Sequence, residues 1–237
     1  MTGPTLLAVA HGSRNPAAAG TIGALARQVS RLAPVLDVRL AFVQHTEPSL
    51  ADGLAAAGTD PVVVPLLLST GYHLTTDIAG AVSSAGTPGT RVAAALGPDP
   101  LLVTALSGRL AEAGAPSGTA VVLAAAGSAD PRAAAAAGEQ ARLLADHLGV
   151  PVAAAFAAAG RPSVREAVTD LRARTGGPVA VASYLIAPGQ FHDSLRQSGA
   201  DWVTEPIGDH PALAGLVIDR YRIATRAGFR PGQYAVR

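Results

Sequence analysis

The chain has 237 residues, of which 49% are apolar and 15% charged, so it has enough apolar material for a sizeable buried core. It contains no cysteine, which excludes disulfides, thiolate metal sites and a cysteine nucleophile. Any bound metal must therefore use imidazole and oxygen ligands. The formal net charge is +1, and all 18 basic residues are Arg without a basic run. This balance argues against nucleic acid or an anionic membrane surface as the main partner.

No stretch of roughly 18 uninterrupted apolar residues is present to cross a bilayer. The start of the chain, MTGPTLLAVAHGS, has no basic leader before its short apolar run. That run continues into a glycine-containing motif instead of a cleavage site. We therefore expect a cytoplasmic protein.

Short apolar runs alternate with Ala-rich segments of helical length through the first half of the chain. The pattern predicts strands near 6–10, 36–43, 61–68 and 91–96, and helices near 17–33, 48–57, 74–84 and 99–113. Such alternation is typical of a parallel sheet that is covered by helices on both faces.

The same pattern starts again after the loop-like GAPSG at 114–118. It predicts strands near 119–126, 151–158, 178–186 and 201–208, and helices near 131–148, 162–174, 190–198 and 210–227. We therefore expect an α/β protein with two tandem domains, residues 1–115 and 116–237. Each would hold a parallel sheet of about four strands flanked by helices.

The two halves also match in sequence, as expected for an internal duplication. HGSRNP at 11–16 matches AGSADP at 126–131, and AFVQHTEPSL at 41–50 matches AFAAAGRPSV at 155–164. VVVPLLLSTGYH, which ends at His73, matches the region VAVASYLIAPGQF, with Gly71 over Gly189.

Three candidate ligands follow three different strands of the first half. His11 comes directly after the first strand, and His73 follows the third strand after a turn at Gly71. Glu47 lies just past the second strand, before a helix that Pro48 is expected to begin. The carboxyl ends of parallel strands line the ligand crevice of an open sheet. We therefore expect His11, Glu47 and His73 to form one metal site.

The second half serves as an internal control for this site. Ala126 stands opposite His11, Arg161 opposite Glu47, and Phe191 opposite His73. The glycines, serines and prolines around them persist, so the losses concentrate where a site would be. Sliding the last loop by one residue would place His192 opposite His73 instead. The first half is predicted to hold the metal and the second to close the cleft.

Imidazole and carboxylate ligands suit divalent Fe, Co, Ni or Zn, and three protein ligands leave a coordination position open. A neutral histidine can also accept a proton near pH 7. Metal insertion into a tetrapyrrole needs both abilities, because two pyrrole N–H protons leave as the metal enters.

The blocks LLAVAHGSRNP, FVQHTEPSLADGL and VPLLLSTGYHLTTDI resemble the class II chelatases, the sirohydrochlorin cobaltochelatase and ferrochelatase family, in its long two-repeat form. The similarity spans most of the chain and is sharp in these first-half blocks. It implies two domains that face each other across a tetrapyrrole cleft. It also implies insertion of Fe²⁺ or Co²⁺ as a metal substrate without ATP, with no permanent cofactor, in a monomer that is an internal pseudo-dimer.

By motif, the resemblance assigns His11 and His73 as the metal-binding and proton-accepting pair. It assigns the acidic position to Glu47, although Gln44 holds a position that can also be acidic in relatives. The eight carboxylates of sirohydrochlorin lead us to expect Arg14 and Arg161 in the cleft.

Ser13, Gly71 and Tyr72 complete the expected substrate-binding residues. Ser13 equally fits a capping role at the following helix, since Ser128 persists in the second half. Tyr72 can stack on a macrocycle or pack at an interface.

Two other functions remain open at this point. A histidine-phosphatase-like phosphoryl transferase also places a nucleophilic His after its first strand, but Ala10 stands where those enzymes carry Arg. A non-catalytic tetrapyrrole or metal carrier needs the same ligands as a chelatase. The sequence does not decide whether the metal is Fe²⁺, Co²⁺ or Ni²⁺. It also does not decide whether the pathway leads to siroheme or to cobalamin. His45 is interpreted as an exposed loop residue, and His147 and His210 as surface or capping residues.

Overall fold

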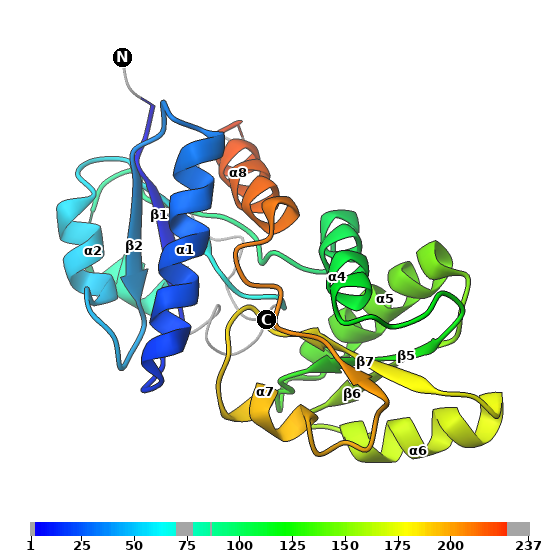
Figure 1. Ribbon diagram of the computed structural model, residues 1–237. Coiled ribbons are helices and arrows are strands. Elements are labelled where there is room, and N and C mark those ends of the chain that lie inside the picture. The colour runs from blue at the N-terminus through cyan, green and yellow to red at the C-terminus, as the bar shows by residue number, and fades with distance from the viewer. Residues whose placement is uncertain (1–2, 70–77, 86, 227–237) are drawn as a thin grey trace.

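The computed structural model describes residues 3–69, 78–85 and 87–226 (Figure 1). Within these residues the chain forms two parallel sheets of four strands each, with orders β2-β1-β3-β4 and β6-β5-β7-β8. Helices cover both faces of each sheet. The predicted α/β architecture of two similar halves is confirmed.

The first half contains β1 (Leu6–Ala10), α1 (Pro16–Leu32), β2 (Val38–Phe42), α2 (Leu50–Ala56), β3 (Val62–Pro65), α3 (Ala79–Ala85), β4 (Arg91–Val92) and α4 (Pro100–Glu112). The second half contains β5 (Ala120–Ala125), α5 (Pro131–Leu148), β6 (Val152–Phe156), α6 (Val164–Thr175), β7 (Val179–Tyr184), α7 (Gln190–Leu195), β8 (Trp202–Val203) and α8 (Pro211–Arg226).

Side-chain caps fix where several helices begin. Asn15 and Asp130 cap α1 and α5 by accepting a hydrogen bond from the backbone two residues on, and a Pro follows each cap. The second helix begins at Leu50 with Ser49 as its cap, two residues later than the expected start at Pro48. A serine hydroxyl satisfies an unpaired N–H of the first turn, which a proline at the start does not do.

The edge strands β4 and β8 are much shorter than the apolar runs predicted at 91–96 and 201–208. β4 forms two residue pairs with β3, and β8 forms two residue pairs with β7. The chain then leaves the sheet edge toward α4 or α8. The apolar residues that follow, such as Leu96 and Ile207, are buried in the core, and their N–H groups donate to the carbonyls of Leu67 and Leu185 just past β3 and β7.

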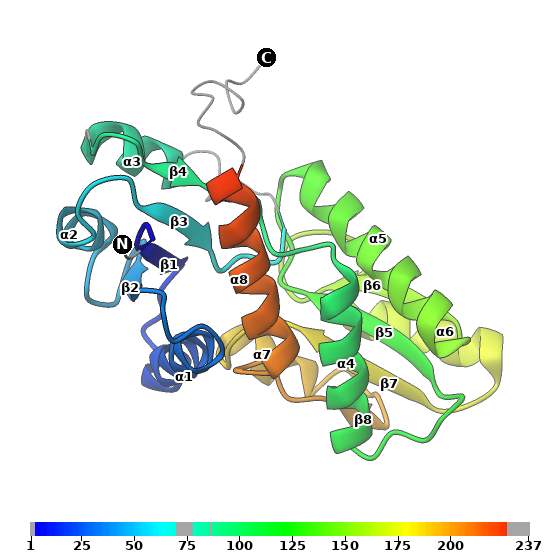
Figure 2. The same ribbon diagram turned by 90° about the horizontal axis from the view of Figure 1, so that it is seen from above.

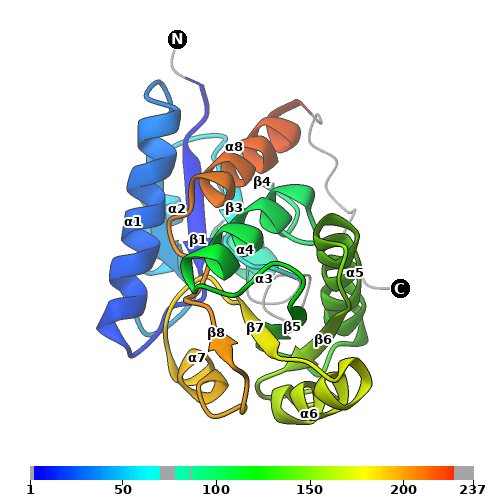
Figure 3. The same ribbon diagram turned by 45° about the vertical axis from the view of Figure 1, so that its right-hand side comes forward.

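The last helix of each half packs against the sheet of the other half. α8 contacts α1, β3 and β4, whereas α4 contacts α5 and β7. The two helices also pack against each other, and Figures 2 and 3 show them side by side between the sheets. Each sheet is thus completed by a helix from the other half.

One apolar cluster therefore runs through both halves. It includes Leu6 and Leu25 of the first half, Leu123 and Leu144 of the second, and Leu106 of α4. The boundary expected near residue 115 stays a prediction, because the sheets are separate while their inner faces share this core. None of the described helices is long and apolar enough to cross a bilayer.

Candidate functional site

A cavity of about 990 Å³ lies between the two halves, at the carboxyl ends of the central strands. Its walls are built from matched positions of the duplication. Residues just after β1 face residues just after β5, and those after β3 face those after β7. Pairs that illustrate this are His11 with Ala126, Ser13 with Ser128, Arg14 with Ala129, and Leu68 with Ile186. The internal repeat has therefore produced two opposed walls of one site.

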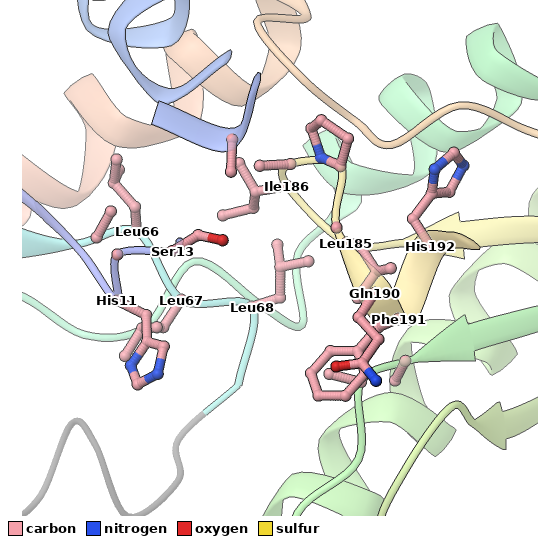
Figure 4. Close-up of a pocket in the computed structure, with 18 of the residues that line it drawn as sticks. His11, Ser13, Leu66, Leu67, Leu68, Leu185, Ile186, Gln190, Phe191 and His192 are labelled. Carbon is pink, nitrogen blue, oxygen red and sulfur yellow. The ribbon is translucent and has the colours of Figure 1, made fainter. Parts of the chain in front are cut away.

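His11 stands at the end of β1 on the first wall (Figure 4). Its Nε2 accepts a hydrogen bond from the side-chain amide nitrogen of Gln44, at 2.6 Å. Gln44 lies in the loop after β2, the strand next to β1. Glu47 was the expected ligand from this loop, but the contact with His11 is made by Gln44.

Gly12 allows these two loops to approach each other. Its φ of 90° is in the left-handed region, and an added Cβ would lie 1.7 Å from the carbonyl oxygen of Gln44. Gly127 has the same conformation, with φ of 93°. The backbone of the turn is thus kept in both halves, while the imidazole is present in the first half and replaced by Ala126 in the second.

Ser13 lines the cavity but has a structural partner at each polar group. Its N–H donates to Thr46 Oγ1 at 3.2 Å, and that hydroxyl donates to the Ser13 carbonyl at 3.1 Å. The Ser13 hydroxyl accepts from the N–H of Asn15, the actual helix cap, at 3.0 Å. Ser128 makes the equivalent contact with Asp130, so the pair stabilises the turn in both halves.

Of the two arginines that were expected in the cleft, one lines the cavity and the other does not. Arg14 is exposed and lines the cavity, and it is the sole Arg among the described lining residues. Arg161 lies outside the lining, and its guanidinium is 2.5 Å from Glu166. Glu166 also accepts hydrogen bonds from Ser163 in a capping box, and these bonds together with Arg161 lower its pKa to about 2.

Glu47 is exposed and lies outside the cavity lining. Gly71, Tyr72 and His73 lie outside the described residues. In the described part of the chain, no three His, Asp or Glu side chains group closely enough to hold a metal ion. The expected set of His11, Glu47 and His73 therefore stays a prediction.

His45 was left out of the expected site, yet it lines the cavity. Its backbone has φ of 63°, a left-handed conformation that is uncommon for residues other than Gly, although Asn, Asp and His adopt it more often than the rest. Its counterpart in the second half is Ala159. The available signal was the same as for His11: an imidazole near a strand end that the duplicated half has lost.

The strand registers bear on which residue of the second half is aligned with His73, but His73 lies outside the described residues and the alignment stays a prediction. Val9 of β1 pairs with Pro65, and the equivalent Ala124 of β5 pairs with Ser183. The offset of 118 residues carries over to Phe191 when no residue is inserted in the following loop. His192 is instead buried, its Nε2–H donates to the Thr204 carbonyl at 3.1 Å, and its ring points away from His11 (Figure 4).

Tyr184, at the end of β7, joins the two walls. Its hydroxyl donates to the carbonyl of Leu68 at 3.0 Å. Burial raises the pKa of this phenol, and the negative charge of Asp99 adds to the rise. Tyr184 is therefore a neutral hydrogen-bond donor that lines the cavity.

Comparisons with known proteins place this arrangement in a family. The CbiX family model matches residues 5–113 and again residues 120–224, one match for each half. The chain belongs to the CbiX family. The expected resemblance to two-repeat class II chelatases is thus confirmed, and each sheet with its flanking helices is one chelatase-like repeat.

Solved structures with the same fold cover almost the whole chain of this CbiX-family protein. SirB from Bacillus subtilis with Fe³⁺ is 24% identical, with a TM-score of 0.82 and coverage of 98% of both chains. The sirohydrochlorin chelatase SirB from Bacillus subtilis subspecies spizizenii, in complex with cobalt, is 24% identical, with a TM-score of 0.75 and the same coverage.

A CbiX described as the terminal enzyme for biosynthesis of siroheme in denitrifying bacteria is 26% identical to the chain. It has a TM-score of 0.70, and the match covers 93% of this chain and 99% of that one. A search of curated protein sequences found no match.

Proposed function

We propose that this protein is a sirohydrochlorin chelatase that inserts Fe²⁺ or Co²⁺ without ATP, in siroheme or cobalamin biosynthesis. The observation that carries the proposal is His11 on the wall of a cavity of about 990 Å³ that both halves of a CbiX-family chain line. Small-molecule sites range from roughly 300 to 1,000 Å³. A cavity at the upper end of that range suits a macrocycle better than a metal ion alone.

The reaction exchanges two protons for one divalent ion. Two pyrrole N–H bonds break, the four ring nitrogens bind the metal, and two H⁺ leave. In our proposal His11 and His73 serve as transient metal ligands and proton acceptors, and Glu47 is a third ligand. A neutral imidazole can fill either role near pH 7. The Nε2 of His11 carries a lone pair that accepts a hydrogen bond from Gln44, and this bond has to break before Nε2 can bind the metal or a proton.

The substrate carboxylates are proposed to meet arginine at the rim of the cavity. Arg14 is exposed there and can bind a carboxylate bidentately. Arg161 is the second proposed partner, and it would have to exchange its ion pair with Glu166 for one with the substrate. Ser13, Gly71 and Tyr72 are proposed to contact the macrocycle.

The first half is proposed to hold the metal and the second to close the cleft, so that a single chain suffices. The fold supports this division, because the second wall has Ala126 where the first has His11. Two halves that share one core act as a dimer within one chain.

The test is to follow the absorbance of sirohydrochlorin anaerobically with Fe²⁺ or Co²⁺. Native protein, His11→Ala and His73→Ala are compared with His147→Ala, which removes an exposed histidine in the last turn of α5. We expect native protein and His147→Ala to accelerate insertion. We expect His11→Ala and His73→Ala to lose roughly 10²-fold or more, the usual worth of a positioned proton acceptor.

Other outcomes would contradict this proposal in different ways. Tight binding of sirohydrochlorin without accelerated insertion would identify a carrier. Metal-independent hydrolysis of an aryl phosphate, abolished in His11→Ala, would identify a phosphoryl transferase. If both histidine variants matched native protein in insertion, the assignment of the site would be wrong.

A further inference from the structure

Phe191 exposes a large aromatic ring inside the cavity. Its exposed fraction is 46%, and among the described residues the other large apolar side chains with comparable exposure are Leu32, Val35 and Ile223. Phe191 alone of these four lines the cavity. A ring of this size gains about 1.5–3 kcal/mol from burial. Its exposure at this place therefore indicates that an apolar ligand covers it.

The duplication places this ring opposite the metal side of the cavity. The register that β1 with β3 shares with β5 and β7 aligns Phe191 in sequence with His73 if the two following loops have the same length. The second wall has also exchanged His11 for Ala126 and Arg14 for Ala129. Figure 4 shows His11 and Phe191 on opposite sides of the cavity.

The stretch between β7 and α7 is apolar on its cavity side. Leu185, Ile186, Ala187 and Pro188 lead from the end of β7 toward α7, and all four line the cavity. None of them carries a charge or a side-chain hydrogen-bonding group. This stretch can bind a flat, apolar ligand face but has no side chain to pair with a carboxylate, and the polar side chain next to it in the cavity is Gln190.

Phe191 belongs to the short helix α7, whose inner side is anchored in the core. His192 and Leu195 on the inner side of α7 are 2% and 1% exposed, and His192 is bonded to the Thr204 carbonyl. The hydroxyl of Ser194 donates to the Phe191 carbonyl at 2.7 Å. The backbone that carries the ring is thus anchored before the ligand arrives, so binding costs little backbone conformational entropy.

We infer that Phe191 is the stacking residue for the macrocycle, with the apolar wall after β7 as its platform. The inference rests on the proposed function. One face of the conjugated ring lies on Phe191, and the other face is presented to His11. The acidic side chains of the macrocycle point along the cleft to its solvent-exposed rim, where Arg14 lies. The second half thus orients the macrocycle and does not merely close the cleft.

The test measures binding of metal-free sirohydrochlorin by its absorbance and by quenching of its fluorescence. Phe191→Ala should raise the Kd about tenfold or more, as expected for loss of a buried aromatic side chain. Its bound spectrum should also lie closer to that of the free ligand. Phe191→Tyr, which keeps the ring, should restore both. Leu32→Ala removes a 50% exposed side chain outside the cavity and should change neither.

The outcomes separate this inference from the proposed function. If native protein binds no sirohydrochlorin, the proposed function fails. If native protein binds it, and Phe191→Ala binds with the same Kd and the same spectrum, the stacking role is overturned while the proposed function stands. Loss of affinity in Phe191→Leu with recovery in Phe191→Tyr supports a role for the ring itself, since both keep apolar bulk.

Discussion

The hydroxyl of Tyr184 in the second half donates a 3.0 Å hydrogen bond to the carbonyl of Leu68 in the first half. Gly97 makes room for this contact, since a Cβ there would lie 2.1 Å from the Tyr184 hydroxyl and 2.5 Å from the Leu68 carbonyl. The bond lies just before the segment that carries His73. The two walls of the cavity are thus joined by a direct hydrogen bond.

Tyr184→Phe should lower the free energy of unfolding by about 1 kcal/mol, because the Leu68 carbonyl loses its donor in a water-poor place. Gly97→Ala should cost about 1–3 kcal/mol, because the added methyl overpacks the same spot. Urea denaturation of both single variants and the double variant checks this. We expect the double variant to be less destabilised than the sum of the singles. Strict additivity would show that the two residues do not share a contact.

Gln44 offers a second prediction, about metal affinity. Its amide nitrogen is 2.6 Å from His11 Nε2, so Gln44→Glu would place a carboxylate beside the proposed ligand. A carboxylate attracts a divalent ion and can bind it, whereas the amide N–H competes for the lone pair. We expect the Kd for Co²⁺, measured by calorimetry, to fall about tenfold, within the usual range for groups that support a metal ligand.

The matched control is Ala158→Glu, at the corresponding exposed position of the second half. It adds the same charge beside Ala126, where no imidazole is present. Cobalt affinity should then stay at the native value. An equal gain in both variants would mean that the carboxylate acts through net charge and not through His11.

The sequence was sufficient for the repeated strand–helix order and for placing His11, Ser13 and Arg14 at the cavity. α5 was expected at 131–148 and is found at Pro131–Leu148, because a capping Asp130, a Pro and a closing Gly149 mark both of its ends. His11 was expected in the cleft and lines it, since residues after parallel strands share one sheet edge. These inferences depend on local patterns.

The exchange of α4 and α8 could not be read from sequence. Apolar periodicity shows that a helix has a face to bury but not which sheet it covers, and α8 packs on strands more than 100 residues earlier in the chain. Arg161 was expected in the cleft only because the substrate carries carboxylates that arginine can bind. The capping box at Ser163 and Glu166, which pairs with Arg161, is visible in the sequence and would have suggested another partner.

Arg220 of α8 carries the third prediction, on stability. Its guanidinium is 3.0 Å from Asp99, the cap of α4, and donates to the carbonyls of Ala95 and Leu96 at 2.8 Å. The Arg220 and Asp99 side chains are 15% and 18% exposed. Arg220→Leu should lower the free energy of unfolding by about 3 kcal/mol, because it leaves a nearly buried carboxylate without its partner.

Arg222 on the same helix is the control for Arg220. It lies 3.5 Å from Asp219, and the two side chains are 59% and 50% exposed. Arg222→Leu should change stability by less than about 0.5 kcal/mol, since solvent screens such a pair. Urea denaturation at low salt compares the two variants. Equal effects would show that Arg220 does not hold α8 to the junction with α4.

His210 gives the fourth prediction, a dependence of stability on pH. It caps α8 by accepting a hydrogen bond on Nδ1 from the Ala212 N–H at 3.1 Å, which requires a neutral ring. Partial burial lowers the pKa of His210 below its ordinary 6.5, and the charge of Arg109 lowers it further. The unfolded chain therefore binds this proton more readily than the folded chain, so the stabilisation is complete above pH 6.5 and is lost as the pH falls below it.

His210→Asn tests this assignment, because Asn is a good helix cap that does not titrate. Thermal unfolding measured from pH 7.5 down to about pH 5 should show a smaller decline for His210→Asn than for native protein. His147→Asn, in the exposed last turn of α5, serves as the control and should keep the native slope. If His210→Asn declined as steeply as native protein, protonation of the α8 cap would not be the cause. The pH dependence would then have to come from other groups.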